Sequence, residues 1–115
     1  MLFSRGDILQ ALFPNSDLRT AKRLPVVVVQ ADDLKTSLPQ VIVAMIPSNL
    51  ARAGHPSRVA VSRADDDFSA TGLLADSVVL TDNLATVIEA EIHRKIGRIA
   101  DMDGVRVALR HTLGL

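Results

Sequence analysis

Two cations stand immediately before a run of valines in the segment KRLPVVVVQADD, residues 22–33. Lys22 and Arg23 therefore bring positive charge to the place where an apolar strand starts, and there they could meet an anion. Arginine in particular offers a forked set of donors that fits phosphate oxygens. Taken by themselves, two such cations are more often solvated surface charges, so both interpretations stay open.

A second group of polar residues follows the next apolar run, VIVAMI. Ser48 can bond a phosphate oxygen, or it can serve with Asn49 in an ordinary turn. Arg52 and Arg58 bracket a loop that contains His55, a residue that titrates near neutrality. This loop could contact an anion with His55 as an auxiliary acid or base, or it could be a solvated loop without such a role.

Composition narrows the chemistry that the chain can perform. Cysteine is absent, which excludes disulfides, thiolate metal sites and a cysteine nucleophile. The acidic run at residues 65–67 cannot direct three carboxylates at one ion from either a helix or a strand. His93 and His111 have no second ligand at a metal spacing. We therefore expect no metal and no cofactor.

Charge is balanced overall and unevenly placed. Residues 1–63 hold eight basic and four acidic residues, which gives +4, whereas residues 64–115 hold five basic and nine acidic residues, which gives −4. The first part of the chain is thus the better candidate for binding an anion.

The pattern of apolar residues predicts an α+β domain. Short apolar runs rich in valine and isoleucine predict strands at residues 7–13, 25–30, 40–46, 58–62 and 77–80. VVVV and VIVAMI do not alternate, so these strands should be covered on both faces. Turn-rich loops are expected at 14–24, 47–57 and 63–75. Residues 86–98 are ambiguous: 89–93 could form one helical turn, with a last strand at 95–99.

A helix is expected at the end of the chain, with Asp101 as its N-cap and Gly114 closing it. With 115 residues, 48% of them apolar, the chain has the size of one domain, residues 1–115. No apolar stretch is long enough for a membrane helix, and the start, MLFSRGD, does not continue as a signal peptide. We expect a cytoplasmic protein without membrane contact.

Five motifs occur in this order: RGDILQALFP, SDLRTAKRLPVVVVQ, VIVAMIPSN, GLLADSVVLTDNLATV and HRKIGRI…LRHTLGL. In order and spacing they resemble the MazF/PemK family of toxin endoribonucleases from bacterial toxin–antitoxin pairs, over nearly the whole chain. The resemblance implies a small SH3-like antiparallel barrel with short helices and a C-terminal helix. It also implies a homodimer, metal-independent cleavage of single-stranded RNA at short sequences, and a cognate antitoxin, through which such toxins join DNA-binding complexes.

Two positions depart from the family pattern. Leu24 stands where many members have their catalytic arginine, and Pro47 stands where a threonine assists it. The resemblance therefore points to the neighbours Arg23 and Ser48 as catalytic candidates. The RNA-binding candidates are cations and one histidine: Arg19, Lys22, Arg52, His55 and Arg58.

Alternation along an extended chain complicates this substitution. Successive side chains point to opposite faces, so Arg23 should point away from where an arginine at 24 would point, whereas Lys22 shares the face of Leu24. Two alternatives to an active nuclease follow: a family member that binds antitoxin or nucleic acid without cleaving, and a plain SH3-like interaction module.

Overall fold

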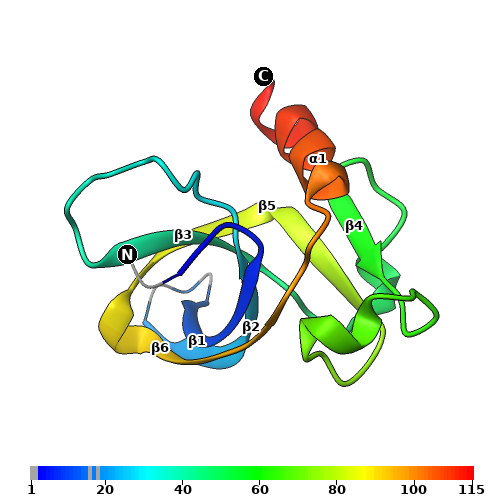
Figure 1. Cartoon of the computed structure of the whole chain (residues 1–115), viewed down its shortest axis with the longest axis horizontal. Helices are drawn as coiled ribbons and strands as arrows, with labels where there is room; N and C mark the ends of the chain where they lie inside the picture. Colours follow the sequence, from blue (N-terminus) through cyan, green and yellow to red (C-terminus); the bar gives the residue numbers. More distant parts are fainter. Residues whose placement is uncertain (1–2, 16, 18) are drawn as a thin grey trace.

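Six strands form a single antiparallel sheet in the order β4-β5-β3-β2-β1-β6 (Figure 1). The structure is a computed structural model, and it describes residues 3–15, 17 and 19–115. The strands are β1 (Asp7–Pro14), β2 (Ala21–Val28), β3 (Gln40–Met45), β4 (Arg58–Val61), β5 (Ser77–Ile88) and β6 (Ile92–Arg98). The helices are the short η1 (Leu50–Arg52), η2 (Phe68–Thr71) and η3 (Glu89–Glu91), and α1 (Asp103–Leu113).

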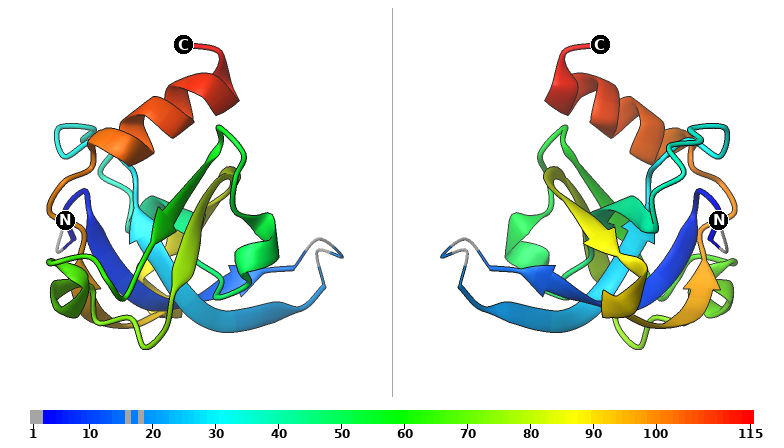
Figure 2. Two further views of the ribbon diagram at one scale, coloured as in Figure 1. Left: turned by 90° about the vertical axis from the view of Figure 1, so that its right-hand side faces the viewer. Right: turned by 90° about the vertical axis from the view of Figure 1, so that its left-hand side faces the viewer.

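β2 begins earlier than the sequence pattern predicts, and this places two candidate residues in a strand. Lys22 and Arg23 were expected in a loop, but they pair with Phe13 and Leu12 of β1. Pro25 lacks only its own N–H, so it removes one donor from the ladder. The residues before it still pair with β1, and β2 therefore begins at Ala21. The outer part of this hairpin projects from the rest of the molecule (Figure 2).

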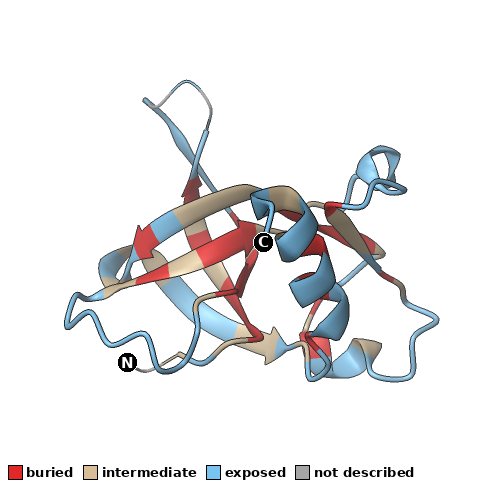
Figure 3. Ribbon diagram, turned by 90° about the horizontal axis from the view of Figure 1, so that it is seen from above, coloured by how far each residue is buried: buried red, intermediate tan, exposed pale blue. Residues whose placement is uncertain are grey.

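The valine run is buried on both faces of the sheet, as its lack of alternation predicts. Val26 and Val28 belong to one buried apolar cluster, and Val27 and Val29 belong to another. Figure 3 shows these buried segments along the central strands, with exposed residues at the hairpin and on the outer side of α1. Two cores therefore fix the central strands from both sides.

The sheet curls strongly but is not closed by strand pairing, so the predicted barrel is not confirmed. β6 packs against η2 and the turn after it. A Cβ built on Gly97 would lie 2.3 Å from the Thr71 carbonyl carbon, and one on Gly72, whose φ is +72°, would lie 2.0 Å from the Ile96 carbonyl oxygen. Glycine permits this close backbone approach, which brings the turn after η2 beside β6.

α1 covers part of one face of the sheet through Val105 and Ala108. The prediction that Asp101 is the N-cap is wrong by one position, because Met102 holds it. The Asp101 carboxylate instead accepts the Asp103 backbone N–H at 3.0 Å. Gly114 ends the helix in the left-handed conformation, as predicted. In the described part of the chain, no helix is long and apolar enough to cross a membrane.

Candidate functional site

A cavity of about 620 Å³ opens where β2 and β3 part from each other. The two strands pair only through residues 26–28 of β2. The Ile46 N–H still donates to the Pro25 carbonyl at 3.0 Å, and the Pro47 carbonyl then accepts the Val78 N–H at 3.0 Å. Since proline has no N–H for a ladder, Pro25 and Pro47 let the chains diverge. The notch between them becomes the cavity.

Five segments of the chain line this cavity, and most of their side chains are apolar. The lining residues are Gln10; Lys22, Leu24 and Pro25; Met45, Ile46, Pro47, Ser48 and Asn49; Gly72, Leu73, Leu74, Ala75 and Ser77; and Arg94 and Ile96. The cavity thus combines apolar walls with a few polar groups, an arrangement typical of ligand sites.

Two cations from different strands reach the cavity. Lys22 of β2 and Arg94 of β6 are both exposed, and neither takes part in an ion pair among the described residues. Gln10 of β1 pairs with Pro25 on one side and Arg94 on the other. Directly paired residues present their side chains on the same face, so Gln10 and Arg94 approach from one face.

The two predicted catalytic residues have different relations to the cavity. Ser48 is exposed and lines it, beside Pro47. Arg23 is exposed and is not a lining residue. It lies two positions outward from Pro25, about 6.6 Å along the strand, and by alternation it shares the face of Pro25 and Gln10. Leu24, at the family's arginine position, is only 8% exposed and belongs to an apolar core cluster.

Arg19, a predicted RNA contact, lies in the β1–β2 connection, outside the cavity lining. The Arg19 backbone N–H donates to the Asp17 carboxylate at 2.9 Å, and the Thr20 N–H donates to it at 3.0 Å. These two backbone hydrogen bonds, first that of Arg19, hold the pKa of Asp17 below its ordinary value. The Arg19 side chain is exposed, so it places a cation at the outer end of the hairpin.

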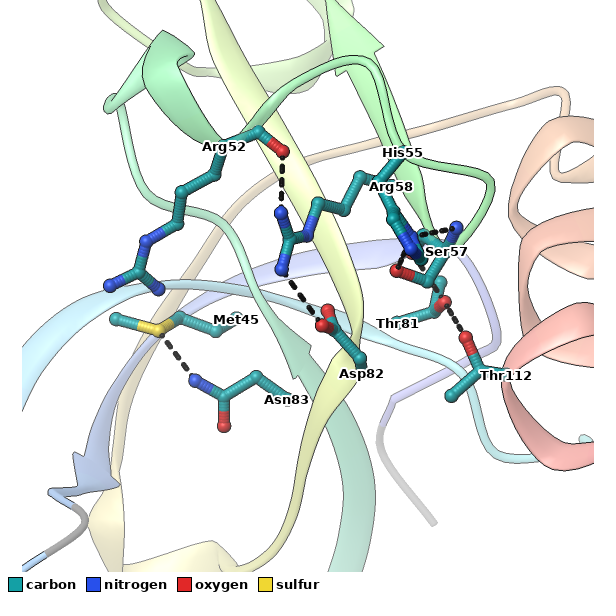
Figure 4. Close-up of polar contacts among 9 residues, drawn as sticks. All are labelled: Met45, Arg52, His55, Ser57, Arg58, Thr81, Asp82, Asn83 and Thr112. Carbon is teal, nitrogen blue, oxygen red and sulfur yellow. Dashed lines mark hydrogen bonds and ion pairs between the residues drawn. The ribbon is translucent and has the colours of Figure 1, made fainter.

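Arg58, another predicted RNA contact, is partly exposed and makes contacts with neighbouring groups of the protein (Figure 4). Its Nη1 donates to the Arg52 carbonyl at 3.0 Å, and its Nη2 lies 3.0 Å from Asp82 Oδ2. The hydrogen bond from Arg58 holds the pKa of Asp82 below its ordinary value. Arg58 thus ties η1 to β5, while the Arg52 residue is exposed.

His55 is part of a hydrogen-bond network that joins its loop to β5 and α1 (Figure 4). The Ser57 N–H donates to His55 Nδ1 at 3.1 Å, and Ser57 Oγ lies 2.7 Å from the same nitrogen. The Thr81 hydroxyl donates to the Ser57 carbonyl at 2.5 Å, so the Thr112 hydroxyl, 2.8 Å away, is the donor to Thr81. Ser57 and Thr81 are buried, so this Ser–His pair cannot present a nucleophile to a substrate.

Acidic and imidazole side chains do not gather into a metal site over residues 3–15, 17 and 19–115. No group of three or more His, Cys, Asp or Glu residues there could hold a metal ion. In the acidic run at 65–67, the Asp65 carboxylate accepts the Ser62 N–H at 2.9 Å. That carboxylate therefore supports a turn.

Comparison with known proteins identifies the family. Residues 4–113 match the model of the PemK-like, MazF-like toxin of type II toxin–antitoxin systems. The chain is 35% identical over 119 residues to endoribonuclease MazF6 of Mycobacterium tuberculosis, covering 100% of both chains. This protein belongs to the PemK/MazF toxin family. Endoribonuclease EndoA of Bacillus subtilis is 31% identical, with 100% of this chain and 97% of EndoA covered.

Solved structures of the PemK/MazF family share this fold. MazF from Deinococcus radiodurans superposes with a TM-score of 0.74 at 18% identity, over 100% of this chain and 99% of that one. A mycobacterial endoribonuclease in complex with its cognate antitoxin gives 0.72 at 23% identity, over 98% and 96%. At these identities the likeness concerns the fold.

Two cavity residues escaped the sequence analysis: Gln10 and Arg94. Both lie in strands whose pairing brings them together, Gln10 opposite Arg94, although they are far apart in the chain. Arg94 is one of three cations in HRKIGR, and Gln10 is a single amide in DILQALF, so neither carries a local signal of a site. Only the neighbour relation between β1 and β6 could have revealed them.

Proposed function

We propose that this PemK/MazF toxin is a sequence-specific, metal-independent endoribonuclease that cleaves single-stranded RNA in the cavity between β1, β2, β6 and residues 45–49. The single observation that carries the proposal is the convergence of Lys22, Ser48 and Arg94 on an apolar-walled cavity in a chain of this family. Its relatives bear the name endoribonuclease. Cellular RNA as substrate implies action in the cytoplasm.

The reaction asks for charge stabilisation and proton movement. The ribose 2′-oxygen gives up its proton and attacks phosphorus, the P–O5′ bond breaks, and the leaving 5′-oxygen takes up a proton. The products are a 2′,3′-cyclic phosphate, which water can open to a 3′-phosphate, and a 5′-hydroxyl. Lys22 and Arg94 would offset negative charge on the phosphoryl oxygens, and the Ser48 hydroxyl would donate to one of them.

Arg23 remains a proposed catalytic group that would act from the rim. It shares the face of Gln10 and Pro25, and its exposed, flexible side chain can swing toward the cavity. Arg19, Arg52 and His55 are proposed RNA contacts outside the cavity lining. Arg58 was predicted as a fourth contact, but it is held by Asp82 and the Arg52 carbonyl, so its contribution would be to hold the loop that carries Arg52 in place.

The nuclease proposal is tested by digesting a long RNA in excess EDTA. We expect cuts at a limited set of sequences, with 5′-hydroxyl and cyclic or 3′-phosphate ends, and a strong loss of rate in Arg23→Ala. RNA that stays intact over many sequences, with a folded protein, would overturn the proposal.

A second candidate function is binding without cleavage. Leu24 is nearly buried in an apolar cluster and Pro47 carries no hydroxyl, so the family's arginine and threonine have no direct replacement. Losing one such donor costs about 10²- to 10³-fold in rate. This alternative predicts RNA or antitoxin binding without cuts, and cleavage after Leu24→Arg together with Pro47→Thr. Efficient cleavage by the unmodified protein would exclude it.

We also propose a homodimer and a cognate antitoxin as partners. One structural neighbour is itself bound to its cognate antitoxin. At the C-terminal end, Val107 is 67% exposed, Leu113 54% and Leu115 83%. Apolar side chains exposed to this extent favour cover by a second subunit. The antitoxin would bind along the cationic cavity and silence it. Light scattering of the toxin alone and with its antitoxin tests both partners.

A further inference from the structure

His55 begins a tight turn, HPSR, at the start of β4. The His55 carbonyl accepts the Arg58 N–H at 2.9 Å, and Pro56 takes the second position, where its fixed φ favours such a turn. The Ser57 N–H donates to His55 Nδ1 at 3.1 Å, and Ser57 Oγ lies 2.7 Å from the same nitrogen. The imidazole is thus bound at Nδ1 by its own turn.

This hydrogen bond decides which ring nitrogen of His55 carries the proton. A neutral imidazole has one N–H and one bare nitrogen. Because Nδ1 accepts the Ser57 N–H, the proton of neutral His55 lies on Nε2. The residue is exposed, and both hydrogen bonds that its ring makes with described residues are at Nδ1. The ring therefore offers an N–H donor at Nε2, and its bare nitrogen is already in use.

Buried hydroxyl residues hold the turn from below (Figure 4). The Ser57 carbonyl accepts the Thr81 N–H at 3.0 Å and the Thr81 hydroxyl at 2.5 Å. The Thr112 hydroxyl of α1 lies 2.8 Å from the Thr81 hydroxyl. Ser57 is 2% exposed and Thr81 0%, so these contacts are shielded from water. A donor fixed in this way loses little further freedom when it binds a ligand.

The groups around the ring favour an anion. The His111 ring of α1, also exposed, lies edge to face with that of His55, with 6.0 Å between the centroids. Arg110 adds a cation to the last turn of α1. The carboxylate on this side of the molecule, that of Asp82, is engaged by Arg58 at 3.0 Å. An N–H donor in these surroundings fits a phosphate oxygen, which forms strong, charge-assisted hydrogen bonds.

We propose that His55 binds an RNA phosphate through its Nε2–H, as a hydrogen-bond donor and not as a general acid or base, with Ser57 and Thr81 as the positioning residues. The inference rests on the proposed RNA-binding function. His55 does not line the cavity, so the phosphate that it binds is not the one that is cleaved. Ser48 and Asn49 do line it, and the chain runs from them through η1 to this turn. An RNA strand that leaves the cavity on this side meets His55.

The variant His55→Asn separates the two ring nitrogens. The asparagine side-chain oxygen accepts the N–H two residues further on, so the turn is kept while the outer donor is lost. The probe is a short RNA with 2′-O-methyl riboses, which lack the attacking hydroxyl, and fluorescence anisotropy gives Kd. We expect binding about 3- to 10-fold weaker, the range for one exposed hydrogen bond, and an unchanged cleavage rate at saturating RNA. His93→Asn, the same change at an exposed histidine of β6, should keep full affinity.

Two further measurements address the positioning of the ring. Nitrogen NMR of labelled histidine, with His55→Asn to assign the signals, should show neutral His55 with a bare Nδ1 and a protonated Nε2. Thr81→Val removes the buried hydroxyl at nearly constant shape and should lower RNA affinity, whereas Thr81→Ser keeps the hydroxyl and should retain the affinity. The NMR measurement and His55→Asn stand even if a Thr81 variant does not fold.

Each outcome decides the matter. A proton on Nδ1, full affinity in His55→Asn, or a loss in that variant confined to the cleavage rate would overturn the inference, even in a protein that cuts RNA. Full affinity in Thr81→Val would overturn the positioning role. Weaker binding by His55→Asn in a protein that cuts no RNA would support the inference and overturn the nuclease proposal. Absence of binding to every RNA by the folded protein would overturn both.

Discussion

Removal of the two cavity cations should weaken RNA binding in a way that depends on salt. In the double variant Lys22→Ala/Arg94→Ala, two exposed side chains from neighbouring parts of the sheet are truncated. Neither is in an ion pair in the described part of the chain. The fold should therefore tolerate the change, and the effect should appear in binding.

Counterion release sets the magnitude. Each phosphate neutralised on a single strand contributes a slope of about −0.7 to log K against log salt concentration. A variant that neutralises two fewer phosphates should therefore have a slope that is less steep by about 1.4. When the salt concentration rises tenfold, both proteins should lose affinity for RNA. The factor by which the unmodified protein loses affinity should be about 25 times larger than the factor for the variant.

Anisotropy with an uncleavable 2′-O-methyl RNA at several salt concentrations measures these slopes. The matched control is Lys35→Ala/Arg106→Ala, which removes the same charges elsewhere: Lys35 lies in the β2–β3 loop, and Arg106 is an exposed residue of α1. This control should retain the original slope. Equal slopes for the cavity variant and the unmodified protein, or equal decreases in both double variants, would refute the assignment of phosphate binding to this cavity.

Three further predictions concern catalysis and stability. Ser48→Ala should slow cleavage about 10²-fold, the cost of one charge-stabilising donor, with RNA affinity unchanged by anisotropy; a loss confined to affinity would contradict this role. Asp82→Asn should lower the free energy of unfolding by about 0.5 kcal/mol at pH 7, as for a half-exposed ion pair. Because Arg58 lowers the pKa of Asp82, this contribution is present above about pH 4, the ordinary carboxyl value, and is lost as the pH falls further. Urea unfolding of Asp82→Asn and the unmodified protein, at pH 7 and well below pH 4, checks this. A stability difference between the two proteins that grows in acid would have the wrong sign. Gly97→Ala should cost more than about 2 kcal/mol, because its Cβ would meet backbone, whereas Gly54→Ala, at φ +86° in open space, should cost about 1 kcal/mol. Equal losses of stability in the two glycine variants would contradict the packing of η2 on β6.

Much of the fold could be predicted from local patterns. The valine run lacks alternation and is buried on both faces, and Gly114 ends the last helix as a left-handed residue. The early start of β2 could not be predicted. Its first residues are held by pairing with β1, a tertiary interaction that overrides the turn signals and the proline in this segment.

The site was only partly predictable for the same reason. Lys22 and Ser48 stand beside apolar runs, so their place near a strand end was visible in the sequence. Gln10 and Arg94 meet only through the pairing of β1 with β6. Arg58 has the charge of a ligand-binding residue, but Asp82, which engages it, is distant in sequence.

The measurement that tests the central claim most directly is single-turnover cleavage of a long RNA in EDTA by three proteins. These are the unmodified toxin, Lys22→Ala/Arg94→Ala and Lys35→Ala/Arg106→Ala. The cavity should carry the reaction, so we expect the unmodified protein and the second double variant to give the same cuts at similar rates, and the first to lose at least about 10²-fold in rate. Undiminished cleavage by the cavity variant, or no cleavage by the folded unmodified protein, would contradict the account.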